Sequence, residues 1–213
     1  MNHITFCFDV VSPYAWLAFE QLPQALRGLS WRVDLRPVLL AALLKHHGQL
    51  GPAEMPGKRE WTYRQVLWQA RQLGVPLQLP AVHPFNPLPL LRLALACGSE
   101  GLVNRHVAET VLRHVWTSGG ADANDPARLA ELRQRLAPAR DPDSDEVKAE
   151  LRANTDAAIA AGVFGVPSFL TDTHLFWGLD GLPLLRARLE GDPWFDGPDW
   201  HTSAQRPAQQ RPR

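Results

Sequence analysis

The stretch H-I-T-F-C-F-D-V-V-S-P-Y-A-W-L, His3 to Leu17, decides the fold because it joins a strand to a helix. β-Branched and aromatic residues dominate from His3 to Val10, and apolar residues stand on both alternating sets. We therefore expect a strand buried on both faces, at the centre of a sheet. Ser12 and Pro13 then pair a preferred N-cap residue with the residue best suited to the first helical position.

A second strand follows the helix, which we expect to end near Gly28. The segment W-R-V-D-L-R-P-V-L, Trp31 to Leu39, alternates apolar and charged residues through Leu35. This pattern is typical of a half-exposed strand, and Pro37 ends it. The chain therefore opens with a β-α-β unit.

Strand signals return only after Gly162. Ser168 to Thr171 and His174 to Trp177 read as two short strands joined by a turn at Asp172-Thr173. A helix is predicted from about Leu182 to Leu189. The chain therefore closes with a β-β-α unit.

The section between Leu39 and Gly162 has helical spacing, interrupted by segments rich in proline and glycine. Asp125-Pro126 predicts the start of one helix, and Asp143 with Glu146 predicts a capping pair for another. Trp61 and Trp68 stand one heptad apart, so we expect them to face the core, although Trp61 could line a pocket. No strand is predicted in this section.

Together these units predict an α/β protein with a thioredoxin-like domain that carries a large all-helical insertion. We expect residues 1–38 and 163–196 to form the thioredoxin-like domain and residues 39–162 to form the inserted helical domain. Residues 197–213 are rich in proline, glutamine and arginine without periodicity, and we expect them to be disordered.

Composition excludes several classes of function. The 213 residues include 22 Lys and Arg and 22 Asp and Glu, so no net charge draws the chain to nucleic acid or to an anionic membrane. No apolar run reaches the roughly 20 residues of a spanning helix, and the first residues lack the features of a secretory signal, so we expect a cytoplasmic protein. Cys7 and Cys97 are too far apart for a C-x-x-C pair, and in that compartment we expect no disulfide.

Two local signals indicate a site in such a fold. Unpaired N–H groups and the positive end of the helix dipole meet at Ser12, which favours an anion such as a thiolate. The alternative is that Ser12 is a plain N-cap. In G-V-F-G-V-P-S-F, Gly162 to Phe169, a cis Val166-Pro167 bond would expose the backbone of Val166 to an extended ligand. The alternative there is an ordinary loop proline.

Four segments carry a resemblance to a known family: F-D-V-V-S-P-Y-A-W-L-A at Phe8–Ala18, P-F-N at Pro84–Asn86, Gly162–Phe169, and F-W-G-L-D at Phe176–Asp180. The chain resembles the 2-hydroxychromene-2-carboxylate isomerase family from about Ile4 to Leu189. That family is related to kappa-class glutathione transferases and to DsbA-like oxidoreductases.

The resemblance implies glutathione as the cofactor, with Ser12 beside its sulfur. It places Val166 and Pro167 against the peptide backbone of glutathione, and the segment Gly178, Leu179 and Asp180 near its γ-glutamyl end. It also implies three substrate-side residues, Lys45, Lys58 and Asn86, a small aromatic or enone substrate, and a homodimer. Gln65 stands where the family often has an aspartate.

Three functions therefore remain open. The first is a glutathione-dependent cis–trans isomerase, the second a kappa-like glutathione transferase, and the third a DsbA-like scaffold that binds extended peptides without chemistry. A disulfide oxidoreductase is disfavoured because Ser12 to Ala15 contains no cysteine. No metal site is predicted, since His46 and His47 lack further ligands at a suitable spacing.

Overall fold

A four-stranded sheet with the order β2-β1-β3-β4 joins the two ends of the chain. The computed structural model describes residues 1–203 and 205. The strands are β1 (Asn2–Phe8), β2 (Trp31–Pro37), β3 (Ser168–Leu170) and β4 (Leu175–Trp177). β1 pairs parallel with β2 and antiparallel with β3, which in turn pairs antiparallel with β4. The prediction that β1 is central, and that the terminal strands share one sheet, is confirmed.

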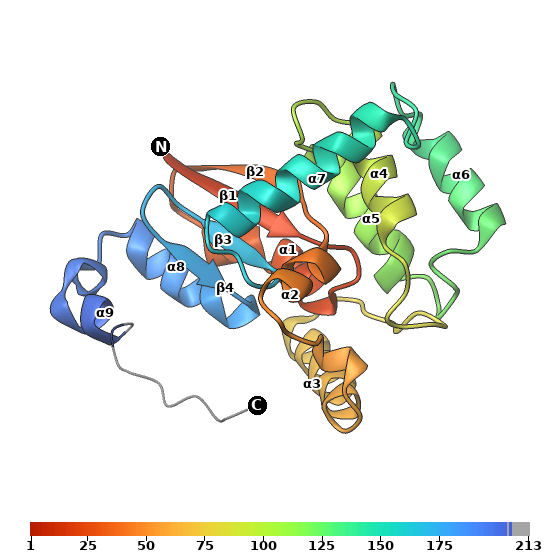
Figure 1. Cartoon of the computed structure of the whole chain (residues 1–213). Helices are drawn as coiled ribbons and strands as arrows, with labels where there is room; N and C mark the ends of the chain where they lie inside the picture. Colours follow the sequence, from red (N-terminus) through yellow and green to blue (C-terminus); the bar gives the residue numbers. More distant parts are fainter. Residues whose placement is uncertain (204, 206–213) are drawn as a thin grey trace.

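Helices cover both faces of this sheet and extend beyond one side of it (Figure 1). The α-helices are α1 (Pro13–Ala25), α2 (Leu40–His46), α3 (Lys58–Leu73), α4 (Leu88–Ala96), α5 (Arg105–Trp116), α6 (Pro126–Leu136), α7 (Asp145–Ala160), α8 (Leu182–Leu189) and α9 (Pro198–Ser203). Three short 3₁₀ helices are η1 (Pro52–Glu54), η2 (Leu179–Gly181) and η3 (Pro193–Asp196). None of the helices within residues 1–203 is long and apolar enough to cross a membrane.

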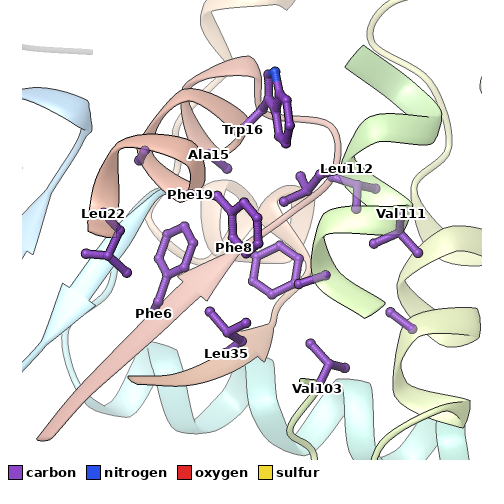
Figure 2. Packing of buried hydrophobic residues seen from close by; sticks show 14 of the residues in the cluster. Phe6, Phe8, Ala15, Trp16, Phe19, Leu22, Leu35, Val103, Val111 and Leu112 are labelled. Carbon is purple, nitrogen blue, oxygen red and sulfur yellow. The ribbon is translucent and has the colours of Figure 1, made fainter. Parts of the chain in front are cut away.

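The alternation of side chains along β1 explains why it is buried on both faces. Ile4, Phe6 and Phe8 point to one side, where they pack with α1 and α5 in the main core (Figure 2). Phe6 stacks on Phe169 of β3, with ring centroids 4.9 Å apart. Cys7 points to the other side and packs in a smaller cluster with residues of α2 and α7. The end of β1 is thereby fixed from both sides, which fixes the start of α1.

Two sequence expectations for the helical section are wrong. Trp61 and Trp68 of α3 do not face the core, because they are 64% and 61% exposed. The buried residues of α3 are Val66 and Ala70. The face of α3 that is turned to the core therefore consists of small side chains and does not include the two tryptophans. Asp143 does not cap α7, because Ser144 is the N-cap and its Oγ accepts a hydrogen bond from Val147 N at 3.3 Å.

The expected disorder of residues 197–213 is also wrong in its first part. Residues 198–203 form α9, and Trp200 packs on the rings of His174, Phe176 and Phe195. The aromatic contacts supply a reason for order that the polar composition of the segment concealed. Residues 204 and 206–213 lie outside the described residues.

Candidate functional site

Ser12 is the N-cap of α1, at the point where β1 delivers the chain to the helix. Its φ of −92° and ψ of 115° are extended, and its Oγ accepts a hydrogen bond from Ala15 N at 3.3 Å. Pro13 has no N–H, and within the described residues the N–H of Tyr14 has no hydrogen-bond partner. Ser12 is only 6% exposed, so this helix terminus is partly shielded from water. The site therefore offers a hydroxyl, a free N–H and the positive end of a helix dipole.

Val166 lies directly opposite this terminus. The Ser12 hydroxyl donates to the carbonyl oxygen of Val166 at 3.4 Å across 154 residues of sequence. The Val166-Pro167 bond is cis, as the sequence analysis predicted. Pro167 O in turn accepts from Gly178 N at 2.9 Å, which ties the proline loop to the end of β4.

η2 brings Asp180 to the same end of α1. Tyr14, two residues beyond Ser12, has a pKa raised by its burial and, to a lesser degree, by the charge of Asp180. Gly178 has a φ of +86°, and a Cβ at that position would stand 2.3 Å from an oxygen of Asp180. The turn therefore folds the Asp180 carboxylate back over its own backbone. Hydrogen bonds thus link Ser12 to Val166 and Pro167 to Gly178, and the charge of Asp180 acts on Tyr14 in the first turn of α1. Leu179 instead lines a groove with Gln21 and Gln24 farther along α1.

The three residues expected on the substrate side are less closely grouped than Ser12, Val166 and Pro167. Lys45 lies exposed near the end of α2, and Lys58 lies exposed at the start of α3. Asn86 is engaged locally, since its Oδ1 accepts from Leu88 N at 3.1 Å at the start of α4. Its own carbonyl accepts from Asn124 Nδ2 at 3.1 Å. No hydrogen bond or ion pair within the described residues joins these three side chains to Ser12.

α3 runs alongside α1 and reaches past the Ser12 end. Tyr14 Oη donates to Gln65 Oε1 at 2.8 Å, while Gln69 and Gln72 line a groove with Gln21 and Gln24 farther along α1. The two helices therefore point in the same direction. α3 begins at Lys58, so its first two turns, which contain Lys58 and Trp61, precede the contact of Gln65 with Tyr14.

Asp9 is a buried carboxyl that the sequence analysis did not assign to the site. Its Oδ1 accepts from Val11 N at 3.0 Å and its Oδ2 from Leu40 N at 2.8 Å. Burial raises its pKa to about 7, against the lowering effect of these two hydrogen bonds. Asp9 therefore ties the loop before Ser12 to the first turn of α2.

Side chains from the helical section hold the carbonyls of the same loop. Trp116 Nε1 donates to Val10 O at 3.0 Å, and His83 Nε2 lies 2.7 Å from Val11 O. No local pattern in the sequence predicts either contact, because they join residues 106 and 72 positions apart.

Neither cysteine lies at the helix terminus. Cys7 is buried in β1, and burial raises the pKa of its thiol to about 11. Burial also raises the pKa of Cys97, which follows α4. A thiolate at Ser12 must therefore come from a bound molecule.

Comparison with known proteins places this geometry in a family. Residues 3–190 match the family described as DSBA-like thioredoxin domain. The chain is 29% identical to glutathione S-transferase kappa 2 of Caenorhabditis elegans, over 92% of this chain and 94% of that protein. It is 27% identical to 2-hydroxychromene-2-carboxylate isomerase of Pseudomonas putida, over 87% of this chain and 93% of that protein.

Solved structures agree on the fold. A structure of a 2-hydroxychromene-2-carboxylate isomerase superposes with a TM-score of 0.76 and 22% identity, covering 93% of this chain and 98% of the other. The predicted α/β thioredoxin-like fold with its helical insertion is confirmed.

Proposed function

We propose, because the chain belongs to the DSBA-like thioredoxin domain family, that it is a glutathione-dependent cis–trans isomerase of the 2-hydroxychromene-2-carboxylate type. The observation that carries the proposal is the Ser12 hydroxyl at the N-terminus of α1, 3.4 Å from the carbonyl of Val166. In the proposed complex the sulfur of glutathione takes the place of that carbonyl as the acceptor of the hydroxyl proton. The free N–H of Tyr14 is a second donor at the same terminus.

The Ser12 hydroxyl and the N-terminus of α1 can supply the free energy that is needed to stabilise a thiolate. A free thiol has a pKa of ~8.5, and lowering it by about two units needs roughly 2.7 kcal/mol of preferential thiolate stabilisation. A helix N-terminus contributes about 0.3 to 1 kcal/mol when exposed and up to ~2 kcal/mol when partly buried. A hydrogen bond to a charged group contributes about 1.5 to 3 kcal/mol. Ser12 and the helix terminus suffice together, and neither suffices alone.

The remaining contacts hold the peptide part of glutathione. We assign the backbone of Val166 to pairing with the cysteinyl residue and Asp180 to the γ-glutamyl ammonium group. Asp180 suits this role because its carboxylate is exposed and has no cationic partner within the described residues. Its charge also acts on Tyr14, two residues beyond Ser12, which supports this assignment.

The reaction follows from a thiolate held beside a conjugated enone. Bound glutathione would supply a thiolate that adds reversibly to the alkene, so that the former double bond could rotate before the thiolate leaves and glutathione is recovered unchanged. The part of the chain itself would be to hold the sulfur as the anion, through the Ser12 hydroxyl and the N–H of Tyr14 at the N-terminus of α1. The carboxylate of the substrate would be bound by Lys58 or Lys45, with Asn86 as a further polar group.

A kappa-class glutathione transferase is the second candidate. Its support is that Glutathione S-transferase kappa 2 matches 92% of this chain at 29% identity, against 87% at 27% for the isomerase of Pseudomonas putida. A transferase would use the same thiolate but keep the adduct. The two functions therefore share Ser12 and differ only in whether elimination follows addition.

The test has two stages. The protein should be retained on immobilised glutathione and elute with free glutathione; a peptide-binding scaffold would show neither. A purified 2-hydroxychromene-2-carboxylate, whose hemiketal ring opens to the cis enone, should then be converted to the ring-opened trans enone, with glutathione unconsumed. Consumption of glutathione with an electrophile, without isomerisation, would favour the transferase, and loss of both retention and turnover would refute glutathione dependence.

We further propose that the chain acts as a homodimer in the cytoplasm, where glutathione keeps thiols reduced. Four large apolar side chains of α3 support association, since Trp61, Leu67, Trp68 and Leu73 are all at least 39% exposed. Light scattering at micromolar concentration should give about twice the chain mass of 23.8 kDa. A single-chain mass at that concentration would refute the dimer.

A further inference from the structure

Both ends of the Val11–Ser12 peptide group are hydrogen-bonded. The N–H of Ser12 donates to Asp9 O at 3.1 Å, and the C=O of Val11 accepts from the imidazole of His83 at 2.7 Å. This peptide plane sets the φ of Ser12, which is −92°. The extended conformation of Ser12 is what lets its Oγ meet Ala15 N on one side and Val166 O on the other.

The hydrogen-bond partners of His83 determine which nitrogen carries the proton. A carbonyl oxygen can only accept, so Nε2 of His83 must carry hydrogen to bond Val11 O. Nδ1 of the neutral ring is then an acceptor, and Tyr63 Oη lies 2.8 Å from it. Tyr63 Oη also lies 3.0 Å from the carbonyl oxygen of His83, so its one proton is shared between two acceptors. Donation to Nδ1 supports the tautomer that the bond to Val11 requires.

The surroundings of His83 favour the neutral ring. Burial lowers the pKa of His83, and the positive charge of Arg59 on α3 lowers it further, against the raising effect of the bond to Val11. Three aromatic rings hold the imidazole edge-on: Tyr63 at 5.5 Å, Trp116 at 5.5 Å and Phe85 at 6.2 Å between centroids. The ring is thus fixed in position by residues of α3, α5 and its own loop.

We propose that His83 is a positioning residue for the thiolate site, in the tautomer that its bond to the carbonyl of Val11 requires. By holding the carbonyl of Val11, His83 fixes the orientation of the Ser12 hydroxyl toward the bound sulfur. The role rests on the proposed function, because it presumes that Ser12 binds the sulfur of glutathione. Because His83 belongs to the helical section, this section would help to position the thiolate site of the thioredoxin-like part.

Paired variants separate positioning from folding. His83→Gln keeps an N–H donor at the distance of Nε2, whereas His83→Leu removes the donor and retains bulk. His114→Leu is the matched control, since His114 is another buried imidazole whose Nε2 bonds a backbone carbonyl, that of Ala123, at 2.9 Å. Within the described residues, the hydrogen bond of the His114 imidazole goes to Ala123 and not to the loop before Ser12.

The first measurement does not need glutathione. Amide hydrogen exchange of residues 10–15 should be faster in His83→Leu than in the wild type, close to wild type in His83→Gln, and unchanged in His114→Leu. Unchanged exchange in His83→Leu would overturn the inference, whatever glutathione does. Faster exchange together with no glutathione binding by the wild type would support the positioning contact and refute the proposed function.

The second measurement is the pKa of the bound glutathione thiol, followed by thiolate absorbance. His83→Leu should raise that pKa by about one unit, and His83→Gln should restore most of the difference. In a Ser12→Ala background, His83→Leu should add no further rise, because His83 acts through Ser12. Additive effects of the two substitutions, or an equal rise in His114→Leu, would overturn the positioning role.

Discussion

At the scale of single residues, the substitution Ser12→Ala tests whether Ser12 is only a helix cap or also donates a hydrogen bond to the thiolate. Ser12→Ala should raise the pKa of bound glutathione by about one to two units, because one charge-assisted hydrogen bond of ~1.5 to 3 kcal/mol is lost. Glutathione affinity should stay within about tenfold, a loss of no more than about 1.4 kcal/mol, since the proposed contacts at Val166 and Asp180 lie away from the sulfur. Thiolate absorbance against pH, with turnover at neutral pH, measures both.

The matched control is Ser144→Ala, which removes an equivalent N-cap bond, from Ser144 Oγ to Val147 N, at the start of α7. It should cost about 1 kcal/mol of stability and leave the thiol pKa unchanged. If Ser12→Ala behaves in the same way as this control, Ser12 is a helix cap only and the proposed mechanism is wrong.

Asp9 links the site to the pH dependence of folding. Its folded pKa of about 7 exceeds the ordinary value of 3.8, so between these values the folded state binds a proton that the unfolded state lacks. The unfolding free energy therefore falls as pH rises through this window, by up to about 1.4 kcal/mol per pH unit.

Asp9→Asn removes the titrating group and keeps one acceptor oxygen for Val11 N or Leu40 N. Urea unfolding at a series of pH values between about 4 and 7 should give a flatter profile for Asp9→Asn than for the wild type. Parallel profiles would mean that Asp9 does not retain its proton in the folded state.

At the scale of elements, the turn η2 fixes where Asp180 lies. Gly178→Ala should lower glutathione affinity by about tenfold or more and lower the melting temperature. The substitution is strained because φ is +86°, and the new Cβ would meet an oxygen of Asp180 at 2.3 Å. Calorimetric titration with glutathione and thermal unfolding measure the two effects.

Gly181→Ala in the same turn is the control. Gly181 has a φ of −73°, and the nearest atom to an added Cβ lies at 3.5 Å, an ordinary contact. This variant should bind glutathione as the wild type does. Equal losses in both variants would show that the turn tolerates no side chain and that the placement of Asp180 is not the cause.

Elements whose signals are local could be predicted from the sequence. β1, α1 and β2 follow from a two-residue period, a Ser-Pro start and an alternating strand, and each lies within two residues of its predicted bounds or ends slightly earlier. The exposure of Trp61 and Trp68 could not be predicted, because a heptad shows that two side chains share a helix face but not which face is covered. α9 was missed because its order depends on contacts of Trp200 with distant rings.

The site likewise contains residues that a local pattern predicts and contacts that depend on distant parts of the chain. Ser12, Val166 and Asp180 lie in segments whose residues carry the resemblance, so they could be proposed without coordinates. The tie from His83 to Val11 crosses 72 residues, and that from Asp9 to Leu40 crosses 31. Such contacts depend on how the helical section docks, which no local pattern specifies.

At the scale of the whole molecule, the helical section is bonded tightly to the sheet. Asn154 of α7 donates to Pro37 O of β2 at 3.0 Å and to Gly101 O at 2.7 Å. Trp116 of α5 binds the loop after β1. One continuous core also contains side chains of β1, α1, α4, α5 and α7. Figure 2 shows the part of it that β1, α1 and α5 form. The boundaries proposed at residues 38 and 163 therefore separate the inserted helices from the sheet along the chain, but one hydrophobic core spans both parts.

This continuity predicts one cooperative unfolding transition for the sheet and the inserted helices. Far-UV circular dichroism, which is dominated by the helices, and tryptophan fluorescence, which samples both parts, should give the same urea midpoint. Asn154→Ala should lower the unfolding free energy by about 2 to 4 kcal/mol, because it leaves two buried carbonyls without donors. The two probes should still coincide in this variant, since the shared core remains. Separate midpoints in the wild type would mean that the insertion folds on its own, and separation in Asn154→Ala alone would mean that Asn154, and not the core, couples the two parts.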